Sequence, residues 1–172
     1  NGPFLADRIH QCGAQLSYQE TVGDDAEEFL QALNRGLATG VNIVISTGAV
    51  SMGRYDFIPD ALRSIGANIV FHKVAMRPGK PILFAILPNG TLYFGLPGNP
   101  ISSAVGFRFF VQLAIQTMQG IASESPMHIP LAHSVVKKSG FTLLQKAKLT
   151  VDASGQLKVR LLKGQESFRI QP

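Results

Sequence analysis

The amino-acid sequence predicts an α/β fold, with a layered α/β domain followed by a small strand-rich unit. Apolar residues at helical spacing alternate with short β-branched runs as far as Met118. From Gly120 onward the helical spacing ends, and prolines and glycines separate short alternating stretches. The chain has 172 residues, of which 45% are hydrophobic, enough for a real core. We therefore expect one domain at residues 1–118 and a small β domain at 119–172.

The first half of the α/β domain alternates between helix and strand. Apolar spacing predicts a helix that ends at Gly13, and alternation predicts a strand over residues 14–22. Asp24 and Asp25 begin a second helix. The run 41–45, Val-Asn-Ile-Val-Ile, is short and rich in β-branched residues, which is typical of a buried parallel strand.

The second half continues this alternation and adds a hairpin. A helix is expected over residues 56–65 and a strand over residues 68–74. Two apolar runs, 82–87 and 91–94, flank Pro-Asn-Gly, which is a strong hairpin signal. A strongly apolar helix then runs from about Ile101 to the end of the domain.

The C-terminal unit is expected to contain a second hairpin. Residues 148–151 and 157–161 alternate around the turn sequence Asp-Ala-Ser-Gly. A segment of this size buries little surface alone, so we expect it to lean on the first domain or to continue beyond Pro172.

Composition and charge exclude several classes of protein. The net charge is +5, and the excess lies after residue 118, in a segment that contains eight basic residues and three acidic ones. That segment lacks interleaved aromatic residues, so we expect a solvated basic face and no nucleic-acid partner. Arg108 and Gln112 interrupt the longest apolar run, so no membrane span is expected. The single cysteine, Cys12, excludes an intramolecular disulfide and fits the cytoplasm.

The loop at residues 95–100, Gly-Leu-Pro-Gly-Asn-Pro, is a candidate anion-binding site. Asn99 can cap the following helix while Pro100 takes its first position, so free backbone N–H groups point out of the loop. Three cations lie close together earlier in the chain: Lys73, Arg77 and Lys80. Exposed solubilising charges would be the simpler interpretation, but an adjacent Pro-Gly turn stiffens their presentation.

A second glycine-rich turn, residues 47–53, follows the strand at 41–45. Gly48 and Gly53 allow close backbone approach to an anion, and Ser51 is the best-placed hydroxyl donor. Tight turns alone would explain one such loop, but two loops and a cation cluster favour a phosphate or oxyanion pocket. Neither a Walker motif nor a G-x-G-x-x-G motif is present, which argues against an ordinary nucleotide triphosphatase or dehydrogenase.

Two aspartates, Asp24 and Asp56, lie near helix starts on the side where the glycine loops gather. Helix capping is the simpler interpretation. Carboxylates that face a phosphate pocket would repel the anion unless a divalent cation intervenes, so Mg²⁺ is the expected companion.

Three motifs occur in an order and spacing that resemble one family. Residues 46–56 read STGAVSMGRYD, residues 71–81 read FHKVAMRPGKP, and residues 95–100 read GLPGNP. The chain resembles the MoeA and gephyrin E-domain family of molybdopterin molybdotransferases. The resemblance implies a three-layer domain with a mostly parallel sheet, followed by a β-barrel-like domain. It implies insertion of molybdate into adenylylated molybdopterin, with Mg²⁺ and release of AMP, by a homodimer.

The resemblance also implies residue roles. Asp24 and Asp56 would lie around the metal or molybdate. Lys73 and Arg77 would bind oxyanion or phosphate as part of the catalytic set. The pterin-binding residues would come from the loops and their neighbours: Gly48, Ser51, Gly53, Lys80, Pro97, Gly98, Asn99 and Pro100.

The sequence departs from the family at two positions and in its extent. Ala49 stands where the family commonly has a second glycine. The family also commonly has an acidic residue near the position that Arg54 occupies here. Asn1 leads directly into a helix, so we expect a fragment, and the resemblance implies two N-terminal domains that this sequence does not include. A binding or scaffold module without catalysis is therefore an alternative. A related molybdopterin adenylyltransferase is another, although it would not need the β tail.

Overall fold

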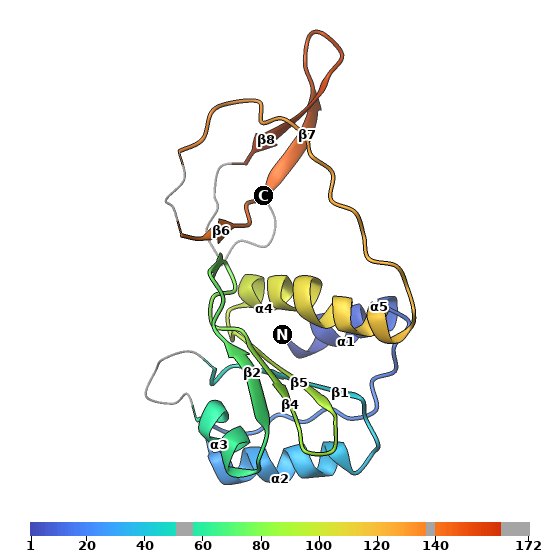
Figure 1. Ribbon diagram of the computed structural model, residues 1–172, viewed down its shortest axis with the longest axis vertical. Coiled ribbons are helices and arrows are strands. Elements are labelled where there is room, and N and C mark those ends of the chain that lie inside the picture. Colours follow the sequence, from blue (N-terminus) through green and yellow to red (C-terminus); the bar gives the residue numbers. More distant parts are fainter. Residues whose placement is uncertain (51–56, 137–139, 163–172) are drawn as a thin grey trace.

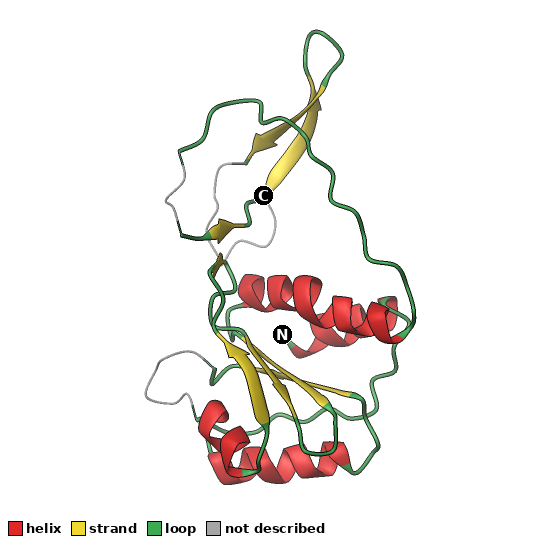
Figure 2. Ribbon diagram, in the orientation of Figure 1, coloured by secondary structure: helices red, strands yellow, loops and turns green. Residues whose placement is uncertain are grey.

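The computed structural model describes residues 1–50, 57–136 and 140–162, and it has three layers (Figure 1). A four-stranded sheet lies between two helical layers, with loops gathered at the sheet ends (Figure 2). One layer contains α1 (Gly2–Gln11), α4 (Pro100–Gly106), a π-helical segment (Phe107–Val111) and α5 (Gln112–Met118). The other contains α2 (Ala26–Leu37) and α3 (Ile58–Ser64). The predicted three-layer α/β arrangement is confirmed.

The sheet is mixed, whereas a mostly parallel sheet was expected. Its order is β1 (Ile43–Thr47), β5 (Leu92–Leu96), β4 (Leu83–Ile86) and β2 (Asn68–His72). Strands β1 and β5 are parallel, but β4 is antiparallel to both β5 and β2. The predicted hairpin explains the difference, because a tight turn joins only antiparallel strands. The expectation of a parallel strand at 41–45 holds for β1.

The segment 14–22 forms no strand, although its alternation predicted one. Its side chains instead attach it to α2. A Cβ added at Gly36 would lie 3.2 Å from the Tyr18 ring, and the Arg35 guanidinium pairs with Glu20 at 2.7 Å. Alternation here reflects contact with a helix rather than with a neighbouring strand.

Side-chain caps fix the starts of two helices, at Asn99 as the sequence predicted and at Asp25 rather than at the neighbouring Asp24. The Asp25 carboxylate accepts hydrogen bonds from the backbone N–H groups of Glu27 and Glu28, both at 2.9 Å. The Asn99 side chain accepts from the Ser102 N–H at 3.1 Å, and Pro100 occupies the first position of α4. Such caps typically contribute about 1 kcal/mol each.

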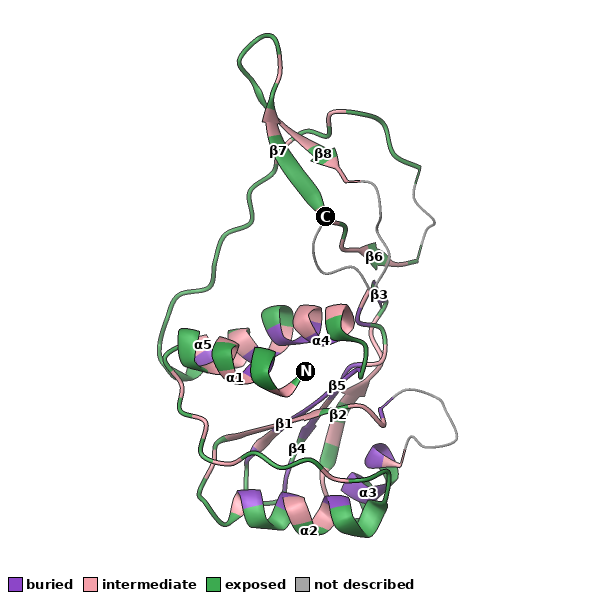
Figure 3. Ribbon diagram, turned by 180° about the vertical axis from the view of Figure 1, so that it is seen from behind, coloured by how far each residue is buried: buried purple, intermediate pink, exposed green. Residues whose placement is uncertain are grey.

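Separate apolar cores fill the two faces of the sheet (Figure 3). One lies under α2 and α3 and includes Leu62 and Tyr93, both fully buried. The other lies under the long helix and includes Phe107 and Leu96. No helix in the described ranges is long and apolar enough to cross a bilayer.

The C-terminal unit is open where a barrel-like domain was expected. Strands β7 (Ala147–Val151) and β8 (Leu157–Leu161) form the predicted antiparallel hairpin. A second contact pairs β6 (Thr142–Leu143) in parallel with β3 (Met76–Arg77). The strands described in this unit form no closed barrel. No described residue beyond 118 is fully buried, so the hairpin has no core of its own to close around.

Candidate anion-binding site

Two loops that are distant in sequence meet at one edge of the sheet. The Gly48 N–H donates to the Leu96 carbonyl at 2.9 Å, immediately after the parallel strands β1 and β5 end. A Cβ added at Gly98 would lie 3.6 Å from the Gly48 Cα, so the glycine loops touch. The Asn1 amide donates to the Gly98 carbonyl at 2.9 Å. The predicted gathering of the two loops is therefore present in the structure.

His72 connects the glycine loop to the end of β2. Its Nε2 lies 2.8 Å from the Val50 carbonyl oxygen. A Cβ added at Gly95 would lie 2.7 Å from Val50 Cγ1, so only glycine leaves room for Val50 there. The sequence alone does not reveal this contact, because a single histidine next to Lys73 at a strand end is equally compatible with packing and with exposure to solvent.

Ser46 and Tyr93 fix the end of β1 from below the loop. The Tyr93 hydroxyl donates to Ser46 Oγ at 2.5 Å. Burial raises the pKa of the Tyr93 phenol, and the bond to Ser46 opposes part of that rise. Tyr93 therefore remains a neutral donor, and the Ser46 oxygen is engaged inside the domain.

Two residues beside these loops adopt left-handed backbone conformations without being glycine. Ala49 has φ +51° and Lys73 has φ +74°. This conformation costs an L-residue about 1–2 kcal/mol relative to the right-handed one. Ala49 is the position where the resembled family commonly has glycine, so the local backbone agrees with the family pattern while the residue does not.

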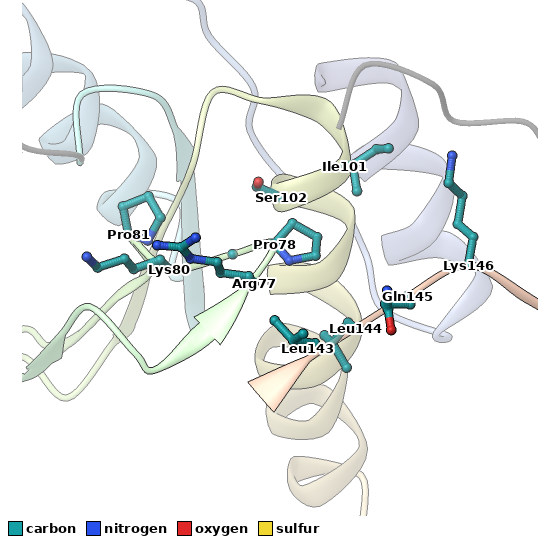
Figure 4. A pocket seen from close by; sticks show the side chains of 11 residues that line it. Arg77, Pro78, Lys80, Pro81, Ile101, Ser102, Leu143, Leu144, Gln145 and Lys146 are labelled. Carbon is teal, nitrogen blue, oxygen red and sulfur yellow. The ribbon is translucent and has the colours of Figure 1, made fainter. Parts of the chain in front are cut away.

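An open pocket of about 510 Å³ lies between residues 73–80, which we call the cation loop, and the C-terminal unit (Figure 4). Its walls come from three segments that the labelled side chains show: the loop after β3, the start of α4 and the chain around β6. The lining residues are Arg77, Pro78, Gly79, Lys80, Pro81, Ile101, Ser102, Leu143, Leu144, Gln145 and Lys146. Two predicted cations, Arg77 and Lys80, therefore line one pocket.

The wall at residues 143–146 was missed by sequence reasoning, and backbone pairing holds it in place. The Thr142 N–H donates to the Ala75 carbonyl and the Leu144 N–H to the Arg77 carbonyl, both at 2.8 Å. The Arg77 guanidinium carbon lies 4.6 Å from the centroid of the Phe141 ring, a cation–π contact. No sequence signal links these segments, which are more than sixty residues apart.

Gly79 lets the cation loop approach α4. Its φ is +103°, and an added Cβ would lie 3.2 Å from Val105 and 3.0 Å from Met76. A larger residue would push the loop away from α4. The position of the loop that carries Arg77 and Lys80 therefore depends on glycine at this point.

Of the other predicted residues, those that the structure describes do not line this pocket. The Lys73 N–H donates to the Ile82 carbonyl at 2.8 Å, at the base of the cation loop. The segment Pro97, Gly98, Asn99 and Pro100 immediately precedes the lining residue Ile101. Asp24 is exposed, one residue before the α2 cap, in the opposite helical layer from α4. Ser51, Gly53 and Asp56 lie outside the described residues.

Asp24 is not grouped with other potential metal ligands in the part of the chain that the structure describes. No cluster of three or more His, Cys, Asp or Glu side chains occurs there. The start of α2 does lie beside the start of α3, because the Phe29 and Phe57 rings are 5.9 Å apart. The predicted Mg²⁺ ligands, Asp24 and Asp56, stay a prediction.

A family profile decides what this fold and these loops belong to. The profile described as "Probable molybdopterin binding domain" matches residues 1–117. The chain belongs to the molybdopterin-binding domain family. The resemblance drawn from the three motifs is thereby confirmed, and the motifs lie within the matched part of the molybdopterin-binding domain.

One curated relative matches most of this chain, and two solved structures share its fold. A molybdopterin molybdenumtransferase of Synechococcus elongatus is 40% identical over 149 residues, which are 86% of this chain and 37% of that relative. The chain thus spans little more than a third of that relative's length. The molybdopterin biosynthesis MoeA protein of Pyrococcus horikoshii has a TM-score of 0.69 at 20% identity, over 98% of this chain and 37% of its own. MoaB of Pyrococcus furiosus, a tungsten cofactor synthesizing protein, has a TM-score of 0.56 at 16% identity, over 69% and 82%.

Proposed function

We propose that this protein is a molybdopterin molybdotransferase in molybdenum cofactor biosynthesis. It would insert molybdate into adenylylated molybdopterin and release AMP. The observation that supports this most directly is the cationic pocket beside the two glycine loops, in a chain 40% identical to a molybdopterin molybdenumtransferase. Arg77 and Lys80 match the phosphate and oxyanion groups of the proposed substrates, because cations and backbone N–H groups are the donors that such anions use.

We assign the anion-binding roles to residues of the cation-bearing segment 73–80 and of the two glycine loops. Arg77 and Lys80 would bind phosphate oxygens within the pocket, with Lys73 at the base of their loop. Gly48, Ser51, Gly53 and the segment 97–100 would contact the pterin and its phosphate. Lys146 extends the cationic lining to the opposite wall. Charge developing on the cleaved phosphate would then meet donors already held in place.

We propose that the acidic residues act through Mg²⁺. The exposed Asp24 carboxylate is the hard oxygen donor that this ion prefers, and Asp56 is proposed as its partner. When bound, the ion would offset the repulsion between these carboxylates and the anionic substrates. Without it the same carboxylates would weaken anion binding.

The test is a calorimetric titration with adenylylated molybdopterin and Mg²⁺, followed by addition of molybdate and an assay of AMP. Binding with AMP release is the expected result. Lys73→Ala should weaken binding itself, whereas Asp56→Asn should weaken the Mg²⁺-dependent release more than binding. Arg63→Ala is a matched control, because this exposed arginine of α3 pairs with Asp60 outside the site. Equal and negligible effects of the two site variants would refute the assignment.

The second candidate is a molybdopterin-binding or scaffold module without turnover. The chain spans 37% of its Synechococcus relative, which favours this alternative for the chain alone. Binding without AMP release would support it. The adenylyltransferase alternative is less favoured, because the chain continues beyond the α/β domain into β6, β7 and β8, which that alternative does not need.

We further propose the surroundings in which the protein acts. A boundary near Met118 would separate the α/β domain from the C-terminal unit, since α5 ends there. A homodimer and a cytoplasmic location would follow from the family assignment, and the single cysteine fits a reducing compartment.

A further inference from the structure

The β7–β8 hairpin has two chemically different faces. Its register places Lys148 opposite Arg160 and Thr150 opposite Lys158 on one face. The alternate positions pair Leu149 with Val159 and Val151 with Leu157 on the other face. One face is therefore cationic and the other is apolar.

The charges of Lys148 and Arg160 are not offset within the described chain. Both side chains are exposed, and the ion pairs between described residues include neither of them. Lys158, by contrast, lies 3.7 Å from the Asp152 carboxylate. Like charges directly opposite one another destabilise a strand pair, so folding alone does not favour Lys148 facing Arg160.

This cationic face continues from the pocket. Lys146 lines the pocket and precedes Lys148 by two residues, the spacing that returns a strand to the same face. The Leu162 N–H donates to the Lys146 carbonyl at 3.0 Å, so the strand pairing reaches the pocket rim. At about 3.3 Å per residue, Lys148 lies about 7 Å along the strand from Lys146. That separation is shorter than the Debye length of about 8 Å at physiological salt.

We propose that the cationic face of Lys148 and Arg160 steers small phosphate esters into the pocket. This inference rests on the proposed function, because it takes adenylylated molybdopterin as the natural ligand. A charged surface that leads into a site of the same sign raises association rates without fixing the ligand in place. The face carries no aromatic side chain, so it lacks the stacking platforms that single-stranded nucleic acid uses.

The experiment measures association by stopped flow for the protein and for the double variant Lys148→Ala and Arg160→Ala, over a range of salt concentrations. Two probes are used, adenylylated molybdopterin and inorganic pyrophosphate. We expect the association rate of both to fall about five- to tenfold at low salt, with the dissociation rate unchanged and the salt dependence shallower. The double variant Lys148→Gln and Arg160→Gln keeps longer side chains and should behave alike.

The matched control removes two charges elsewhere. The double variant Arg8→Ala and Arg63→Ala takes them from α1 and α3 and should leave the association rate within about twofold, because screening weakens distant charges. An equal fall of the association rate in this control would overturn the inference, because the net charge of the protein would then explain both results. An unchanged rate in the hairpin variants would overturn it as well.

Two further outcomes separate this inference from the proposed function. If pyrophosphate shows the expected pattern but adenylylated molybdopterin does not bind, steering stands and the proposed function fails. If the hairpin variants lose binding to a single-stranded oligonucleotide while both probes associate normally, the face serves nucleic acid and the inference fails. If neither probe binds the unaltered protein, both fail.

Discussion

The α/β layers and the C-terminal unit of this chain differ in how much apolar surface they bury and in their net charge. The α/β layers hold every fully buried apolar side chain in the described ranges, from Leu5 to Ile115. The C-terminal unit holds none, and Leu144 is its one described apolar residue packed against a core of the other part. The charges divide in the same way, since residues 1–118 are balanced and the +5 excess lies beyond them.

This difference indicates that the two parts contribute to the pocket in different ways. The α/β layers have the packing needed to hold loops in costly conformations, such as those of Ala49 and Lys73. The C-terminal unit supplies a wall and charge, which require only backbone pairing to β3 and an exposed hairpin. Substitutions at buried apolar positions of the first part should therefore act mainly on stability, and those at exposed charged positions of the second mainly on ligand capture.

The largest expected effect separates the two parts by stability. Leu62→Ala, at a fully buried position in α3, should lower the free energy of unfolding by about 2–5 kcal/mol through lost burial and a cavity. Leu157→Ala, at a position 43% exposed in β8, should cost less than about 1 kcal/mol. Urea unfolding of both variants measures the difference. Similar losses would contradict the claim that only the α/β layers contain a core.

Sequence reasoning succeeded where the deciding interactions were local. Asp25 and Asn99 were predicted at their helix starts, and the turn at Asn89 and Gly90 gave the β4–β5 hairpin. Local patterns also suggested a strand at 14–22, but strand formation needs a partner strand that no local pattern reveals. The mostly parallel sheet was implied by the resemblance, whereas the locally predicted hairpin already required one antiparallel pair.

The residues of the candidate site can be divided in the same way, into those that local sequence reveals and those that only long-range pairing brings together. Arg77 and Lys80 were found because they are close in sequence to a Pro-Gly turn. Lys146 and Phe141 were not, because only the pairing of β6 with β3 brings them to the cation loop. Motifs therefore reveal the half of the pocket that lies in one segment, and tertiary structure supplies the other half.

The next effect concerns strain in the well-packed part. Ala49→Gly should raise the free energy of unfolding by up to about 1 kcal/mol, because relief of the left-handed conformation outweighs the added backbone entropy of glycine. Ala38→Gly is the control, since Ala38 caps α2 with φ −62° and gains no relief. Its unfolding free energy should fall by about 0.5–1 kcal/mol. Urea unfolding reports both, and the same sign in both variants would rule out strain at Ala49.

A smaller effect tests the contact between the two parts. Phe141→Leu removes the ring under the Arg77 guanidinium, a contact of 4.6 Å. An exposed cation–π contact contributes about 0.5–1 kcal/mol, so the free energy of unfolding should fall by at most this amount. Pyrophosphate affinity should fall as well, by no more than about two- to fivefold, because the ring no longer holds Arg77 in position. Calorimetry provides the affinity. Phe4→Leu, at an exposed position of α1, is the control and should leave the affinity unchanged.

The smallest effect lies in the hairpin turn and depends on pH. The Ser154 hydroxyl donates to Asp152 at 2.6 Å, and with the N–H groups of Gln156 and Ser154 it lowers the pKa of this carboxyl below its usual 3.8. The unfolded chain therefore binds the proton more tightly than the folded hairpin does. The stabilisation is complete above about pH 4 and is lost as the pH falls through the lowered pKa. The protection factors of the β7 and β8 amides, which are exchange rates corrected for their intrinsic pH dependence, should fall over that range in the unaltered protein. Asp152→Asn keeps an acceptor oxygen but cannot titrate, so its protection factors should not change with pH there, whereas an equal fall would place the titrating group elsewhere.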